Sequence, residues 1–159
     1  MHRYASSVLL AALLIGAVAP AALAQGATGA TEQMSAVAAS SITWTEAAVP
    51  GFPAGMKIAV IQGKPDSAGL YTLRLSFPDG YRFPPHWHPM AEHLTVLSGT
   101  LQLAMGERAD ESKLKAYAPG DFLFMPARKA HFGGARGFTV VQLHGQGPFA
   151  INLVETTSR

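Results

Sequence analysis

The chain has 159 residues, of which 48% are hydrophobic and 14% are charged, and it contains no cysteine. This length and apolar content suit a single domain with one hydrophobic core and argue against general disorder. The lack of cysteine excludes a disulfide framework, a zinc site built from thiolates and a catalytic cysteine. The formal net charge of +2 is too small to predict nucleic acid as the main partner.

Residues 1–24 have the composition of a secretory signal peptide. His2 and Arg3 give a basic start, residues 8–19 form an apolar run, and an Ala-Leu-Ala cleavage site ends at Ala24. The run is shorter than the roughly 20 residues that a membrane span needs. We therefore expect cleavage after Ala24, a secreted or periplasmic protein, and no stable membrane insertion after cleavage. An uncleaved N-terminal anchor is the alternative.

Residues 25–41 are rich in Ala, Gly, Ser and Thr and contain few large apolar side chains. This composition predicts a flexible lead-in, with a short alanine-rich helix as the alternative. The patterning of a folded domain covers residues 42–159, which we expect to form one domain.

From residue 42 onward the sequence predicts short strands joined by Gly/Pro turns. In residues 71–77 alternate positions are apolar, which is the period of two of a half-buried strand. The expected strands are residues 56–61, 71–77, 92–97, 100–105, 122–125, 138–144 and 151–154. Gly99 and the pair Gly133-Gly134 are interpreted as breaks between strands. Many short strands without a long helical period predict an all-β sandwich or barrel.

Three side chains of metal-ligand type lie close together in the sequence: His86, His88 and Glu92. On a strand, residues i and i+2 share a face, so both imidazoles can point at one ion. Pro89 interrupts the strand, and the chain can then bend to bring Glu92 to the same centre. Neutral imidazoles and a carboxylate suit a divalent transition metal. Two hydrogen-bonded imidazoles on a polar strand face are the alternative for the histidine pair.

The wider spacing carries a resemblance to a known family. Gly80, five residues, His86-x-His88, three residues, Glu92, six residues and Gly99 match the first motif of the cupin family. The resemblance implies a small double-stranded β-helix, or jelly-roll, barrel.

A second, partial motif lies downstream, in Gly120, five residues, Pro126 and then His131. Cupins usually carry Gly two residues after this proline, where Arg128 stands here, and often Asn four residues after the histidine, where Ala135 stands. The glycine change puts the turn geometry in question, because Gly serves where φ must be positive. The resemblance implies one ion held by His86, His88, Glu92 and His131, the ion being iron, manganese, nickel, copper or zinc.

Three further polar residues are candidates for contacts behind the metal ligands. His93 follows Glu92 and would face away from the ion on a continuing strand, so outer-face packing is the alternative. Gln142 and His144 share one face of the strand predicted at residues 138–144. They could reach the metal or the substrate if that face lines the barrel, and a polar strand end is the alternative.

These observations lead to two main functional hypotheses. The first is a metal-dependent enzyme that oxidises a small organic substrate in the manner of a dioxygenase, with Glu92 able to act as a base. The second is a non-catalytic module that binds a metal or a small ligand, because fold does not fix function. A metal-free structural barrel is a third reading. The family resemblance also suggests a homodimer.

Overall fold

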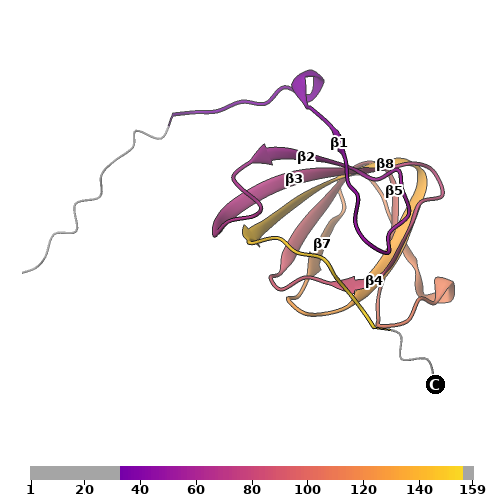
Figure 1. Cartoon of the computed structure of the whole chain (residues 1–159). Coiled ribbons are helices and arrows are strands. Elements are labelled where there is room, and N and C mark those ends of the chain that lie inside the picture. The colour runs from indigo at the N-terminus through magenta and orange to yellow at the C-terminus, as the bar shows by residue number, and fades with distance from the viewer. Residues whose placement is uncertain (1–32, 156–159) are drawn as a thin grey trace, which may run out of the picture. The chain divides into compact units, whose positions relative to one another are not determined.

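The computed structural model describes residues 33–155, and within that range nine strands pair into one curled antiparallel sheet (Figure 1). The strands are β1 (Thr45–Glu46), β2 (Lys57–Gln62), β3 (Gly69–Phe77), β4 (Arg82–Trp87), β5 (Glu92–Met105), β6 (Lys115–Tyr117), β7 (Phe122–Met125), β8 (His131–Gly147) and β9 (Asn152–Leu153). Two 3₁₀ turns accompany them, η1 (Ala39–Ser41) and η2 (Glu111–Lys113). The prediction of an all-β jelly-roll barrel is confirmed.

The long strand β8 holds the barrel together because it pairs with β3, β4 and β5. β5 in turn pairs with β6 and β7, and β3 continues the sheet through β2 to β1. The strands curl around a common interior, as Figure 1 shows. This arrangement brings residues that are far apart in the sequence to one enclosed space.

The core follows from the alternation that the sequence predicted in β3. Leu73, Leu143 and Leu94 lie in one row across β3, β8 and β5, and all three are buried, with Leu73 fully so. Burying such a side chain stabilises the fold by about 1.5–3 kcal/mol relative to leaving it exposed. The intervening residues Thr72 and Arg74 face outward and are partly exposed.

Two predicted boundaries were wrong. The strands expected at residues 92–97 and 100–105 form the single strand β5, and the break expected at Gly99 is a bulge within it. Gly99 has a φ of +73°, and a Cβ there would collide with the backbone of Phe138. The chain therefore uses glycine to let β8 approach without ending β5.

The strand expected at residues 138–144 is part of a longer one, because β8 already begins at His131. Gly133 and Gly134 lie inside β8 and are buried. The two short strands β1 and β6 were not predicted, and β4 was anticipated only in the assumption that His86 and His88 lie on a strand.

The predicted signal peptide, residues 1–24, lies outside the described residues, as does the lead-in as far as residue 32. Residues 33–38 have no regular secondary structure and precede η1. In the part of the chain that the structure describes, no helix has the length and hydropathy to cross a membrane.

Candidate metal centre

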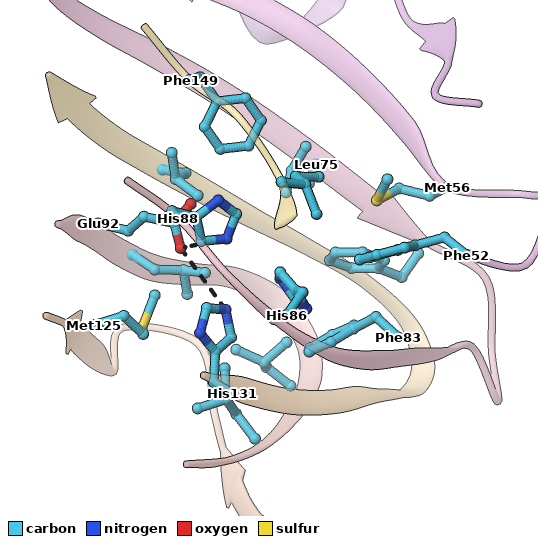
Figure 2. A pocket seen from close by; sticks show the side chains of 16 residues that line it. Phe52, Met56, Leu75, Phe83, His86, His88, Glu92, Met125, His131 and Phe149 are labelled. Carbon is cyan, nitrogen blue, oxygen red and sulfur yellow. Dashed lines mark ion pairs between the residues drawn. The ribbon is translucent and has the colours of Figure 1, made fainter. Parts of the chain in front are cut away.

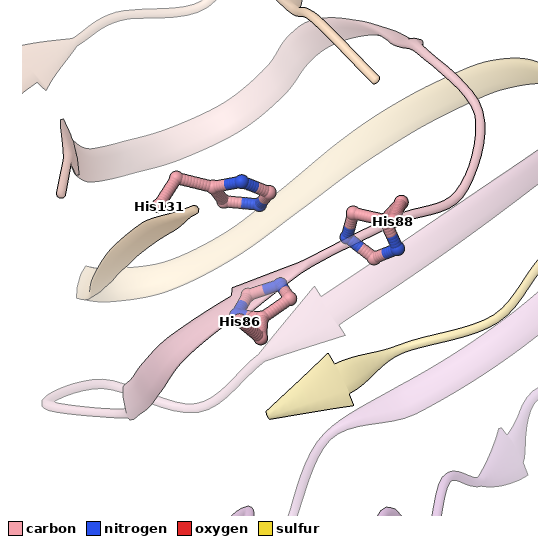
Figure 3. Close-up of side chains that lie close together, drawn as sticks. All are labelled: His86, His88 and His131. Carbon is pink, nitrogen blue, oxygen red and sulfur yellow. The ribbon is translucent and has the colours of Figure 1, made fainter. Parts of the chain in front are cut away.

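Three buried histidines from two neighbouring strands converge on one point (Figure 3). His86 lies near the end of β4 and pairs directly with His131, the first residue of β8. His88 follows immediately after β4, and one ring nitrogen from each histidine lies within 4.8 Å of the others. These three side chains are placed to hold a metal ion.

The local sequence shapes the strand that carries His86 and leads into His88. Pro84 and Pro85 precede His86, and proline cannot donate a ladder hydrogen bond. The β4–β8 register accordingly shifts between Phe83 and His86. The regular pairing is recovered at His86, so its side chain meets His131 across the strands.

Backbone carbonyls fix the tautomer of each imidazole. In each histidine Nδ1–H donates to a nearby carbonyl oxygen, which can only accept. The distances are 2.8 Å from His86 to Pro84, 2.8 Å from His88 to Ala150 and 3.3 Å from His131 to Lys129. Each Nε2 is therefore left with a free lone pair, which is the form that ligates a metal.

Burial keeps these imidazoles neutral. It lowers the pKa of His86 below its ordinary value. Burial, followed by the charge of neighbouring imidazoles, lowers the pKa of His88 to about 4 and that of His131 to about 3. At neutral pH all three lone pairs are therefore available.

Glu92 brings a carboxylate to the same place. It is the first residue of β5 and is only 2% exposed. Its Oε2 lies 3.2 Å from Nε2 of His88 and 3.9 Å from Nε2 of His131 (Figure 2). Its Oε1 is buried and has no hydrogen-bond partner among the described residues. Burial raises the pKa of this carboxyl to about 8.

This donor set fits a divalent cation. The Nδ1 protons are turned outward to carbonyls, so when Glu92 is ionised its carboxylate and the Nε2 atom of His88 face each other with lone pairs only. Such a contact is unfavourable unless a proton or a cation lies between the two atoms. A proton can satisfy one such pair, whereas a metal ion can satisfy all the converging groups together. Imidazole nitrogens with a carboxylate suit iron, manganese, nickel, copper or zinc.

The histidines and Glu92 open onto a cavity of about 470 Å³, including the part that is open to solvent. Its other lining residues are apolar or aromatic, as Figure 2 shows. Phe52 and Phe83 meet the ring of His86 edge-on, with centroids 5.0 and 5.6 Å apart, and Phe149 stacks on His88 at 5.2 Å. Phe52 and Phe149 were not among the residues predicted from the sequence, because they come from loops without a regular pattern.

The three polar residues proposed to lie behind the ligands are on the outer face of the sheet. Gln142 accepts a hydrogen bond from Arg74, and His144 is exposed beside Thr72. In this part of β8 the residues that face inward are instead the buried Val141, Leu143 and Gly145. The structure does not bring Gln142 or His144 to the three histidines.

His93 is also exposed on the outer face of the sheet. It packs against Phe122 and Phe124, with ring centroids 5.9 and 5.1 Å apart. This is the outer-face packing named as the alternative, and it separates His93 from the cavity.

Arg128 adopts the positive φ for which a glycine would ordinarily be used at this turn. Arg128 has a φ of 60°, and among residues 33–155 no other non-glycine residue has a positive φ. Its backbone N–H donates to the carbonyl of His88 at 2.8 Å. The turn therefore supports the segment that carries His88, at the cost of a strained residue.

Comparison with known proteins gives one family match. The family model described as "Cupin domain" matches residues 73–143, the range from β3 to β8. Germin-like protein subfamily 1 member 7 of Arabidopsis thaliana is 31% identical over 98 residues. That alignment covers 57% of this chain and 43% of the relative, so this chain spans less than half of the germin-like protein.

Solved structures with similar folds include two enzymes. The polyketide cyclase RemF from Streptomyces resistomycificus matches with a TM-score of 0.66 at 17% identity, covering 79% of this chain and 89% of that chain. The DMSP lyase DddQ from Ruegeria pomeroyi DSS-3 matches with a TM-score of 0.58 at 19% identity, covering 76% and 64%. At these identities the likeness is one of fold.

Proposed function

Because this chain belongs to the cupin superfamily, we propose that it binds one divalent transition metal and uses it in an enzymatic reaction on a small organic molecule. The ligands in this proposal are His86, His88, Glu92 and His131. The observation that carries it is the convergence of three Nε2 lone pairs and the buried carboxyl group of Glu92 on one apolar cavity.

When bound, such a metal supplies Lewis-acid chemistry and, if it is iron or copper, redox chemistry with dioxygen. The protein supplies the surroundings. The apolar walls exclude water and hold the substrate against the ligand cluster. Glu92 combines two roles in this proposal: Oε2 faces the histidines, and Oε1 can take up or release a proton of the substrate.

The reaction class we propose is dioxygenation. Both atoms of dioxygen enter the organic substrate, which is oxidised while dioxygen is reduced, so no further reductant is needed. The described residues that line the cavity include no lysine or arginine, which favours a largely apolar substrate with a chelating oxygen group over a polyanion.

The location proposed for this protein rests on its sequence. A signal peptide at residues 1–24 would deliver the domain to a periplasm or to the outside of the cell. A homodimer is a further proposal from the family resemblance, and sedimentation velocity would test it.

A non-catalytic binding module is the second candidate. The cavity is largely apolar, which also suits storage or sensing of a metal or a compact ligand. Solved structures with this fold include proteins described as a cyclase and as a lyase, so the fold alone does not fix the reaction.

Oxygen uptake distinguishes these candidates. The protein, expressed from the full sequence and purified without chelators, would be loaded with Fe(II) or Cu(II) and offered a panel of catechols, β-diketones and phenols. We expect dioxygen consumption with at least one chelating substrate, and its loss in Glu92→Gln. A protein that holds metal yet consumes no dioxygen and converts none of the panel would contradict the dioxygenase and favour the binding module.

A further inference from the structure

Tyr71 is a buried tyrosine whose inward position the proposed metal chemistry leaves unused. It lies in β3 and is only 3% exposed. Tyr71 pairs with Gly145 of β8, and Gly145 pairs in turn with Glu92 of β5. Residues paired across strands share a face of the sheet, so the three form one inward-facing row with Gly145 in the middle.

The missing side chain of Gly145 makes room for the phenol. A Cβ atom at Gly145 would overlap the hydroxyl oxygen of Tyr71 and would lie 2.7 Å from Cζ and 3.1 Å from Cε1 of its ring. Gly145 is not among the glycines with positive φ, so its backbone conformation does not require glycine. The tyrosine therefore lies across Gly145, with its hydroxyl end directed along the row toward the strand of Glu92.

The ring of Tyr71 is held in this position by Phe149. The two rings meet edge-on with centroids 5.7 Å apart, and Phe149 also stacks on the ring of His88. Burial raises the pKa of the Tyr71 hydroxyl, and the charge of Glu92 raises it further. The hydroxyl thus keeps its proton at neutral pH, and it lies close enough to Glu92 for the charge of an ionised carboxylate to affect its pKa.

Glu92 offers a matching acceptor. Oε2 faces the histidines, whereas Oε1 is buried without a partner among the described residues. We propose that Tyr71 is a positioning residue, whose hydroxyl reaches across Gly145 and donates to Oε1 of Glu92 through one bridging water. The hydrogen bond orients the carboxylate so that Oε2 is presented to the metal. This inference rests on the proposed ligation by Glu92.

The test is the affinity for zinc, measured on the full chain by competition with a chromophoric chelator. Tyr71→Phe keeps the packing of the ring and removes only the hydroxyl. We expect it to weaken zinc binding about 10- to 100-fold, the usual effect of removing a group that orients a ligand. Tyr81→Phe is the matched control, because Tyr81 donates its hydroxyl hydrogen bond to the carbonyl of Pro53. It should leave the affinity unchanged.

A double-mutant cycle tests whether Tyr71 acts through Glu92. In the Glu92→Gln background, Tyr71→Phe should cost much less affinity than in the wild type. A Tyr71→Phe protein that binds zinc as tightly as wild type, or an equal loss in both backgrounds, would overturn the positioning role. If wild-type protein binds none of zinc, iron, copper, manganese and nickel, the metal proposal itself fails, and this inference fails with it.

Discussion

His86 and His131 face each other across two antiparallel strands, with their ring centroids 4.3 Å apart. Both rings are buried, and both donate Nδ1–H to backbone carbonyls behind them. Two imidazolium ions at this separation in a buried site would repel each other strongly. The fold thus prepares a pair of neutral imidazoles whose Nε2 atoms are free to bind a cation.

The pH dependence of the metal-free protein follows from the buried histidines and Glu92. The pKa values of His88 and His131 in the fold, about 4 and about 3, lie below the ordinary 6.5, so below pH 6.5 the unfolded chain binds more protons. Stability is therefore lost as the pH falls. The folded pKa of Glu92, about 8, lies above the ordinary 4.5, so stability is also lost as the pH rises toward 8.

Denaturant unfolding of metal-free protein across the pH range should therefore show a maximum in the free energy of unfolding near pH 6.5. Below this pH the histidines reduce stability, and above it Glu92 does. A stability that rises steadily between pH 6.5 and 8 would contradict the buried, unpaired state of Glu92.

Glu92→Gln separates the effect of the buried carboxyl group on stability from its role as a metal ligand. The amide cannot ionise, so the loss of metal-free stability on the alkaline side should disappear. Metal affinity should fall by at least roughly 10- to 100-fold, because that is the effect of losing a residue that only orients a ligand. Chemical unfolding and metal titration measure the two effects, with the exposed Glu107→Gln as control. Unchanged metal affinity in Glu92→Gln would remove Glu92 from the ligand set.

Arg128→Gly should stabilise the protein by about 0.5–1 kcal/mol. A non-glycine residue in the left-handed region costs about 1–2 kcal/mol, part of which is offset because glycine loses more entropy on folding. Lys129→Gly is the matched control, since this exposed neighbour lacks a positive φ and should be destabilised. Thermal unfolding compares the two. A destabilised Arg128→Gly would show that the arginine side chain contributes more than its backbone strain costs.

The N-terminal prediction is tested by maturation in a bacterial host. If residues 1–24 form a signal peptide, protein recovered from the periplasm should begin at Gln25. N-terminal sequencing of full-length and periplasmic material settles this directly. Retention of Met1 in a membrane-bound fraction would instead favour the uncleaved anchor.

The sequence predicted the barrel and the histidine cluster because the relevant signals are local or have a fixed spacing. The alternation in residues 71–77 and the spacing from Gly80 to Gly99 predicted the class of fold. His86, His88 and His131 meet in the structure, as the cupin resemblance implied.

The extent and facing of β8 could not be predicted, because they depend on neighbouring strands. Gly133 and Gly134 read as a loop, yet Cβ atoms there would collide with the backbone of Gln102 and Tyr81. These glycines permit close approach inside a sheet rather than a turn.

The facing of residues 138–144 was ambiguous for a related reason. Val140 and Val141 are adjacent, so either face of the strand could be the apolar one. Pairing with β3 and β5 buries Val141 and Leu143, and it turns Gln142 and His144 outward.

Metal content tests the central claim most directly. Full-length protein purified without chelators or an affinity tag would be measured by elemental analysis beside a His86→Ala/His88→Ala double variant. His93→Ala serves as the control, because it removes an exposed histidine on the outer face. We predict about one transition-metal ion per chain in wild type and in His93→Ala, and none in the double variant. A wild-type protein that contains no metal and takes up none when it is added would contradict the metal centre.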